Sequence, residues 1–209
     1  MIIAIDGPSA AGKGTLAARL AQAYGLRRLD TGTLYRAVAL TLLASGRDPG
    51  AEEAAQAAAK VDLAGMDDAA LRTPEVGRVA SIVAAFPAVR AALIEAQRDF
   101  AAQGRAVIDG RDIGTVIWPQ AEVKLFVSAS PEARAMRRWQ EHQARGEALS
   151  LERVAQDLAT RDARDAARDT APLMAAPDAH LLDTSALGIE EVVEIARRIV
   201  DAAITPPRG

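Results

Sequence analysis

A glycine-rich loop close to the N-terminus constrains this chain more than any other feature. Residues 7–15, Gly-Pro-Ser-Ala-Ala-Gly-Lys-Gly-Thr, follow an apolar run at 1–5 and precede a helical stretch at 16–24. A phosphate-binding loop requires this order of elements: a strand, then a glycine-rich loop with a lysine, then a helix. The loop N–H groups, the positive end of the helix and the Lys13 ammonium would all bind phosphate. The alternative is a glycine-rich turn that matches by chance, and the flanking strand and helix argue against it.

The residue after Lys13 narrows the class of nucleotide-binding protein. Gly14 stands where GTPases and most ATPases have the serine or threonine that binds Mg²⁺, and a hydroxyl follows one residue later, at Thr15. This ending is typical of small-molecule kinases that hold the metal mainly through waters and the nucleotide. We therefore expect Mg²⁺ to arrive with ATP and to have no direct protein ligand. The predicted ATP-phosphate residues of the loop are Gly7, Pro8, Ser9, Ala10, Ala11, Gly12, Lys13, Gly14 and Thr15.

Length, charge and composition exclude several other classes of protein. A chain of 209 residues suits one domain, and its net charge of −3 argues against nucleic-acid binding by bulk electrostatics. The lack of cysteine excludes a disulfide framework and a thiolate metal site. No stretch approaches the ~20 apolar residues that span a membrane, and the N-terminal run is too short for a signal peptide. We expect a cytoplasmic protein that binds neither nucleic acid nor a membrane.

Short apolar runs alternate with segments of helical periodicity along most of the chain. The runs lie at 2–5, 26–29, 106–108, 123–127 and 180–182, and the helical segments at 16–24, 33–44, 89–102, 132–145, 151–166 and 189–203. This alternation predicts an α/β fold with a central five-stranded parallel sheet flanked by helices. Asp6, Asp30 and Asp109 come at or just after strand ends, where such sheets bind their ligands.

Two regions interrupt the alternation. Residues 31–103 are helical with no strong strand, and residues 132–169 form a charged helical pair. We expect a single domain, residues 1–209, with a core of 1–30, 104–131 and 170–204, one helical subdomain at 31–103 and a lid region at 132–169.

The segment 29–36 predicts a second anion site near the loop. Asp30 or Thr31 can cap a helix after a strand, and Arg36 lies one turn into that helix. A helix N-terminus with an arginine beside it attracts an anion. A capping turn with a surface arginine is the alternative interpretation.

The segment 106–115 resembles a Walker-B strand followed by charged residues. Asp109 ends the apolar run and could orient the waters around Mg²⁺. Arg111 and Asp112 would project into the same crevice. Read in isolation, the segment could also be an ordinary turn.

Arginines gather on the charged helical pair. Arg134, Arg137 and Arg138 share one helix face, and Arg161, Arg164 and Arg168 share another. A mobile arginine-rich lid would supply the positive charge that phosphoryl transfer requires. The alternative is a solvated helix with internal pairs, such as Asp165 with Arg161.

Taken together, these motifs closely resemble those of bacterial cytidylate kinases, which belong to the nucleoside monophosphate kinases. The resemblance spans nearly the whole chain. It rests on residues 6–15, 29–36, 81–87 with Arg90, 109–115, 161–165, Arg168 and 171–173. The segments 81–90 and 109–115 are the specific ones, because the family reads cytosine there.

The resemblance implies ATP-dependent phosphorylation of CMP, and of dCMP, with release of ADP. It assigns nucleoside monophosphate binding to the subdomain at 31–103 and implies a monomer. The implied catalytic residues are Lys13, Arg111, Arg161 and Arg168. Arg134 and Arg138 join the loop in binding ATP. The implied CMP residues are Thr31, Arg36, Ser81, Arg90, Arg111, Asp112, Arg161, Asp165 and Arg168.

Within the implied CMP site, Arg36, Arg111 and Arg168 would bind the acceptor phosphate. Ser81, Arg90 and Asp112 would hydrogen-bond the cytosine edge. Arg161 and Asp165 would contact the ribose. Thr31 stands where the family commonly has serine, and it keeps the hydroxyl.

One segment departs from the long bacterial form of the family, which carries a small inserted β-sheet. Residues 61–79 are too short and too poor in strand pattern for that sheet, so we predict a loop and a short helix. Two rival functions remain open at this level. One is a kinase for another acceptor, such as AMP, UMP or shikimate, and the other is a nucleotide-binding regulatory module without turnover.

Overall fold

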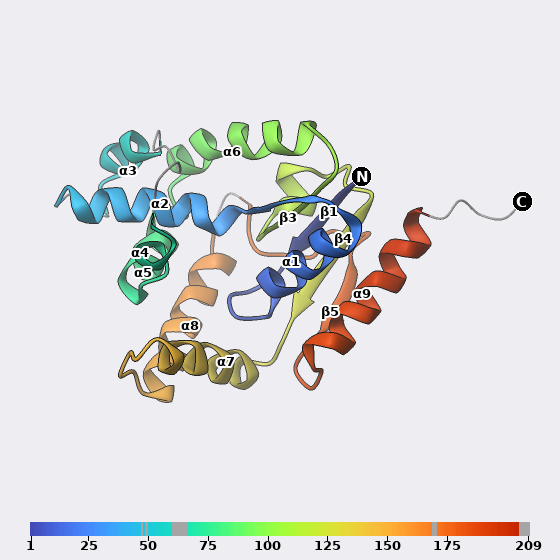
Figure 1. The fold of residues 1–209 in the computed structure, drawn as a ribbon. Coiled ribbons are helices and arrows are strands. Elements are labelled where there is room, and N and C mark those ends of the chain that lie inside the picture. Colours follow the sequence, from blue (N-terminus) through green and yellow to red (C-terminus); the bar gives the residue numbers. More distant parts are fainter. Residues whose placement is uncertain (47, 49, 60–66, 169–170, 205–209) are drawn as a thin grey trace, which may run out of the picture.

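Five parallel strands form the centre of the molecule (Figure 1). The computed structural model describes residues 1–46, 48, 50–59, 67–168 and 171–204. The strands are β1 (Ile2–Asp6), β2 (Arg27–Asp30), β3 (Ala106–Gly110), β4 (Val123–Ser128) and β5 (His180–Asp183). They are ordered β2-β3-β1-β4-β5, and every neighbouring pair is parallel. The predicted α/β fold with a five-stranded parallel sheet is confirmed.

Helices cover both faces of this sheet. They are α1 (Lys13–Tyr24), α2 (Thr31–Ala44), α3 (Glu52–Ala58), α4 (Asp68–Leu71), α5 (Pro74–Val83), α6 (Pro87–Ala102), α7 (Pro131–Ala144), α8 (Leu151–Ala166) and α9 (Ile189–Ile204), with a π-helix, η1, at Ile113–Ile117. Ile3 and Ile5 point to the face covered by α1 and α9. Ile2 and Ala4 point to the opposite face, against α6 and η1. A strand alternates its side chains between two faces, so a fully aliphatic β1 is buried on both.

Two further apolar clusters lie outside the sheet core. One joins α2, α3, α5 and α6, and the other joins α7 and α8. The proposed boundaries of the subdomains stay a prediction. Among the described helices none is by itself long and apolar enough to cross a membrane, although α5 and α6 pass on length and composition as a pair bent by 100°.

The segment at 61–79 differs in part from its prediction. Residues 61–66 lie outside the described residues, and the remainder holds the short helix α4 and the start of a longer one, α5. The Thr73 hydroxyl accepts from the Val76 N–H at 3.3 Å, and Pro74 occupies the first turn. This cap and proline start α5, a second and longer helix, within the segment for which we predicted a loop and one short helix.

Candidate active site

The glycine loop crosses closely over β4 before it enters α1. Gly7 has φ +145°, and a β-carbon on it would lie 2.0 Å from the carbonyl oxygen of Val127. Gly12 caps α1 with φ +92°, a left-handed conformation that favours glycine. These two glycines set the path of the backbone that places the start of α1 at the carboxyl end of the parallel strands.

Lys13 lies inside this loop, with its side chain buried. Its Nζ donates to the carbonyl oxygen of Pro8 at 2.6 Å. Burial, and then the charge of Arg111, hold the pKa of Lys13 well below its ordinary value. A cation held by a neutral carbonyl among other cations is stabilised by an incoming anion.

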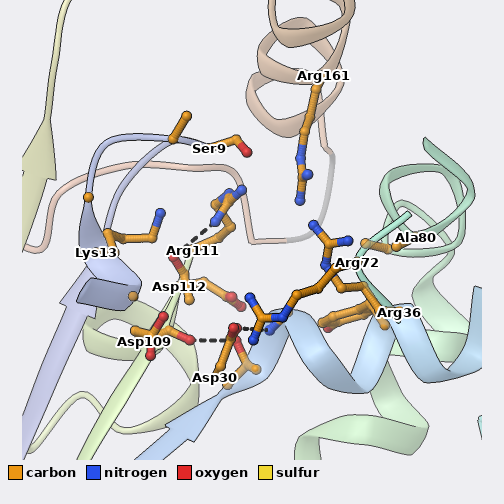
Figure 2. A pocket seen from close by; sticks show the side chains of 18 of the residues that line it. Ser9, Lys13, Asp30, Arg36, Arg72, Ala80, Asp109, Arg111, Asp112 and Arg161 are labelled. Carbon is orange, nitrogen blue, oxygen red and sulfur yellow. Dashed lines mark hydrogen bonds between the residues drawn. The ribbon is translucent and has the colours of Figure 1, made fainter. Parts of the chain in front are cut away.

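A cavity of about 500 Å³ opens beside the loop (Figure 2). Nine cationic side chains line it against four carboxylates, although the whole chain carries a net charge of −3. The cations are Lys13, Arg28, Arg36, Arg72, Arg90, Arg111, Arg138, Arg161 and Arg168. This local reversal of charge makes the cavity a site for anions.

The arginines of this cavity are partly desolvated and lie close to one another. Burial, and then the charge of Arg138, lower the pKa of Arg36 to about 10. Burial, and then the charge of Arg111, lower the pKa of Arg161 to about 9. The buried Nε atoms of Arg90, Arg161 and Arg168 make no hydrogen bond within the described structure. Unsatisfied donors of this kind are available to a phosphate or to a base.

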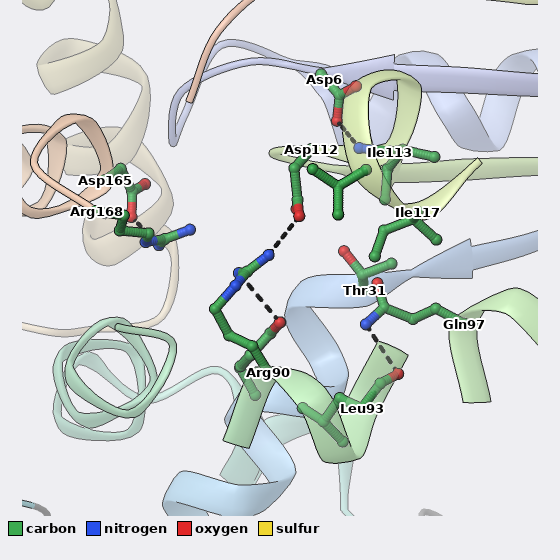
Figure 3. A network of polar contacts seen from close by, with 12 residues as sticks. Asp6, Thr31, Arg90, Leu93, Gln97, Asp112, Ile113, Ile117, Asp165 and Arg168 are labelled. Atoms are coloured by element: carbon green, nitrogen blue, oxygen red, sulfur yellow. Dashed lines mark hydrogen bonds and ion pairs between the residues drawn. The ribbon is translucent and has the colours of Figure 1, made fainter. Parts of the chain in front are cut away.

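Arg90 and Asp112 meet in the wall of the cavity (Figure 3). Arg90 donates to the Asp112 carboxylate, and its Nη1 also donates to the Tyr35 hydroxyl at 3.4 Å. Asp112 directly precedes η1, whose first N–H groups, of Ile113 and Gly114, donate to Asp6 at 2.8 Å each. The end of β1 thus fixes the position of Asp112.

Asp165 accepts from two arginines of the cavity. Arg111 Nε donates to it at 2.9 Å, and Arg168 donates to its other oxygen. Burial opposes ionisation, but the charges of Arg111, Arg161 and Arg168 hold the pKa of Asp165 below its ordinary value. Asp165 therefore acts as the fixed anion that orients these arginines, and its main partners are Arg111 and Arg168.

Asp109 is the penultimate residue of β3 and lies beside Asp30, its partner in the register of β2 (Figure 2). Burial, and then the charge of Asp30, raise the pKa of Asp109 to about 6. Arg28 Nε donates to Asp109 at 3.3 Å. Two neighbouring carboxylates at the cavity edge suit a hydrated divalent cation, whereas no described group of three or more His, Cys, Asp or Glu residues could hold a metal directly.

Arg134 and Arg138 connect α7 to the loop. Arg134 pairs with Asp162 at 2.7 Å and reaches the Ser9 carbonyl at 3.4 Å, while Arg138 donates to the Ser9 hydroxyl at 3.3 Å. Arg137 instead donates to Thr184 after β5. The side chains of these three arginines therefore do not all reach the same site.

Most of the predicted site residues surround the cationic cavity. Those that line it are Ser9, Ala10, Gly12, Lys13, Gly14, Thr15, Thr31, Arg36, Arg90, Asp109, Arg111, Asp112, Arg138, Arg161 and Arg168. Gly7, Pro8, Ala11, Ser81, Arg134 and Asp165 are not part of its lining. Ser81 accepts from Arg164 at 2.8 Å, and the Thr31 hydroxyl donates to the Asp109 carbonyl at 2.9 Å. These side chains have protein partners in this structure.

A second cavity of about 470 Å³ adjoins the loop, and it was not predicted from the sequence. It shares Ala10, Gly12, Thr15 and Glu141 with the first cavity. Its other lining residues are Ala11, Arg137, Gln140, Ala144, Thr184, Leu187, Ile189 and Val192. Apart from Ala11 of the glycine loop, they come from α7, α9 and the turn after β5, so no contiguous motif marks them. In the first cavity, Arg28, Tyr35 and Arg72 were not predicted either.

Comparison with solved structures supports the fold. An uncharacterized protein from Eubacterium ventriosum superposes with a TM-score of 0.55 at 12% identity, covering 97% of this chain and 98% of that one. A sugar kinase from Janibacter gives a TM-score of 0.51 at 16% identity, covering 98% of each chain. At these identities the similarity concerns the fold alone.

Comparison of sequences identifies the family. The family model for cytidylate kinase matches residues 3–202. A cytidylate kinase of Xanthobacter autotrophicus is 57% identical over 203 residues, covering 97% of this chain and 98% of that protein. One of Granulibacter bethesdensis is 55% identical over 201 residues, covering 96% of both. The chain, a kinase with a phosphate-binding loop between two cavities, belongs to the cytidylate kinase family.

Proposed function

We propose that this kinase transfers the γ-phosphoryl group of ATP to CMP and to dCMP, with release of ADP. The observation that carries the proposal is the meeting of two cavities at the phosphate loop, where Ala10, Gly12 and Thr15 line both. Transfer between two nucleotides requires two sites whose phosphate ends converge on one point.

The donor would occupy the second cavity and the loop. Leu187, Ile189 and Val192 provide an apolar surface for a flat base. The triphosphate would then lie along the loop, near Lys13 and the arginines of α7. Arg134 and Arg138 already contact Ser9 of this loop.

The acceptor would occupy the cationic cavity. The Asp112 carboxylate can accept from the amino group of cytosine, and the unpaired Arg90 Nε can donate to a ring acceptor. Arg36, Arg111 and Arg168 would bind the phosphate. We assign the ribose to Arg161 and Asp165, and an additional base contact to Ser81.

Transfer would proceed in line across the loop. A phosphate oxygen of CMP forms a bond to the γ-phosphorus while the bond to the bridging β–γ oxygen breaks, and ADP leaves. Lys13, Arg111, Arg161 and Arg168 would stabilise the charge that develops on the equatorial oxygens. When bound, Mg²⁺ neutralises β- and γ-phosphate charge, and Asp109 with Asp30 would hold its water shell.

A coupled assay of ADP release with a panel of acceptors tests this proposal. We expect kcat/KM for CMP and dCMP to exceed those for UMP, AMP and shikimate. AMP outrunning CMP would place the chain among kinases for another acceptor. Binding of ATP without ADP formation on any acceptor would indicate a regulatory module.

A further inference from the structure

Arg28 lies in the cationic cavity but has no part in the roles assigned so far. Arg27 and Arg28 are consecutive residues of β2, so their side chains leave opposite faces of the strand. Arg27 donates to Gln103 and to the carbonyl oxygen of Gly104, away from the cavity. Arg28 faces the cavity, and its side chain is 32% exposed. The pair offers a site residue and a neighbouring control of the same type.

The Arg28 guanidinium lies between Asp109 and the start of α1. Its Nε donates to Asp109 Oδ1 at 3.3 Å. A β-carbon on Gly14 would lie 3.2 Å from Arg28 Nη2 and 3.9 Å from Asp109 Oδ2. The missing side chain at position 14 therefore leaves the space that this guanidinium uses.

The contact between Arg28 and Asp109 reduces a concentration of negative charge in the cavity. Asp30 and Asp109 are partners in the β2–β3 register, and both line the cavity that also holds Lys13. Their negative charges oppose the binding of nucleotide phosphates nearby. A hydrated divalent cation would offset these charges, and Arg28 already offsets the charge of Asp109 at hydrogen-bond distance.

We propose that Arg28 is a resident counter-ion of Asp109 that takes over part of the metal's electrostatic role and so lowers the dependence of nucleotide binding on Mg²⁺. Arg28 is a positioning residue in this scheme, since it acts through Asp109. The inference rests on the proposed function, in which Asp109 holds the water shell of the metal. Without Arg28, Asp109 would repel metal-free nucleotide more strongly and would be more available to the hydrated metal.

Binding of ADP measured by calorimetry, once in EDTA and once in saturating Mg²⁺, tests the inference without turnover. We expect Arg28→Leu to raise the ratio of the metal-free Kd to the Mg²⁺ Kd by about tenfold, within the range of ordinary coupling between two ligands. Arg28→Lys keeps the charge and should stay near the wild-type ratio. Arg27→Gln should leave the ratio unchanged. Thermal melting of each variant checks that it is folded.

Different outcomes would contradict the role of Arg28 and the proposed kinase function. An Arg28→Leu ratio within about twofold of the wild type, or tighter ADP binding in EDTA, would overturn the role of Arg28. A wild-type protein that binds ADP in neither buffer, or that forms no ADP with CMP, would instead overturn the proposed function. An equal rise in the Arg27→Gln ratio would show a general effect of β2 rather than a counter-ion.

Discussion

Arg90 donates a hydrogen bond to Asp112, and the two side chains are only 4% and 7% exposed. Each neutralises the other in a wall of the cationic cavity, so the two base-reading candidates form one unit. Removal of either partner leaves a buried charge without its counter-ion, which is costly. This pairing gives Asp112 a structural role in addition to its proposed role in base recognition.

Asp112→Asn should weaken discrimination between cytosine and uracil. The amide can donate as well as accept, so it can pair with the carbonyl that uracil presents where cytosine has an amino group. We expect the CMP-to-UMP ratio of kcat/KM to fall by about tenfold or more. The KM for ATP serves as the internal control and should hardly change. If the acceptor ratio keeps its wild-type value, cytosine is recognised elsewhere.

Lys13→Ala should abolish most of the activity and leave the fold intact. Lys13 is buried, with a pKa held low by burial and by Arg111, so its removal relieves a desolvation cost. We expect kcat to fall about 10³-fold, as for loss of a key electrostatic contact in a transition state. Thermal melting should show no loss of stability. A kcat close to the wild type would remove Lys13 from the catalytic residues.

Arg111→Ala should impair catalysis and CMP binding together. Arg111 lines the cavity and also binds Asp165, which orients Arg168. Its loss would free a buried carboxylate beside the acceptor phosphate as well as remove a donor. We expect kcat to fall and the KM for CMP to rise by about tenfold each, whereas Arg164→Ala should mainly raise the KM for CMP through Ser81. Unchanged kinetics with CMP would exclude Arg111 from the site.

Asp6 should make the protein more stable at mildly acidic pH. Burial raises the pKa of Asp6 to about 6, from 3.8, so the folded state binds the proton more tightly than the unfolded state. This contribution to stability is present at low pH and is lost as the pH rises through about 6. The difference in free energy of unfolding between wild type and Asp6→Asn should shift in favour of the wild type by about 1 kcal/mol between pH ~7.5 and pH ~5. Urea titrations at several pH values measure it, and a difference that is flat or grows with pH would contradict the assignment.

The strands and the phosphate loop could be predicted because each is encoded locally. Runs such as Ile2–Asp6 are aliphatic throughout, and the acidic residue at the end marks the sheet edge. The arginine-rich segments also predicted a cluster of positive charge, and the structure brings Arg138, Arg161 and Arg168 from these segments into the lining of one cavity. That this cavity binds an anion stays a prediction.

The pairings inside the site could not be predicted in the same way. Arg90 and Asp112 are separated by 22 residues, and Arg111 and Asp165 by 54, so only the folded chain brings them together. The second cavity takes its lining from three separate parts of the chain. By contrast, the cap at Thr73 and the proline at Pro74 are local signals that would have placed the start of α5.

The π-helix η1 carries a consequence for changes in chain length. The Asp112 carbonyl accepts from both Val116 and Ile117, and Trp118 reaches back five residues to Ile113. This segment therefore has about one residue more per turn than an α-helix. Deletion of a single residue between Asp112 and Trp118 would tighten the turn and rotate the downstream residues by about 100° relative to β4. A change of length that an ordinary surface loop tolerates should therefore disturb the structure here, because the length of this segment sets the position of β4 relative to Asp112.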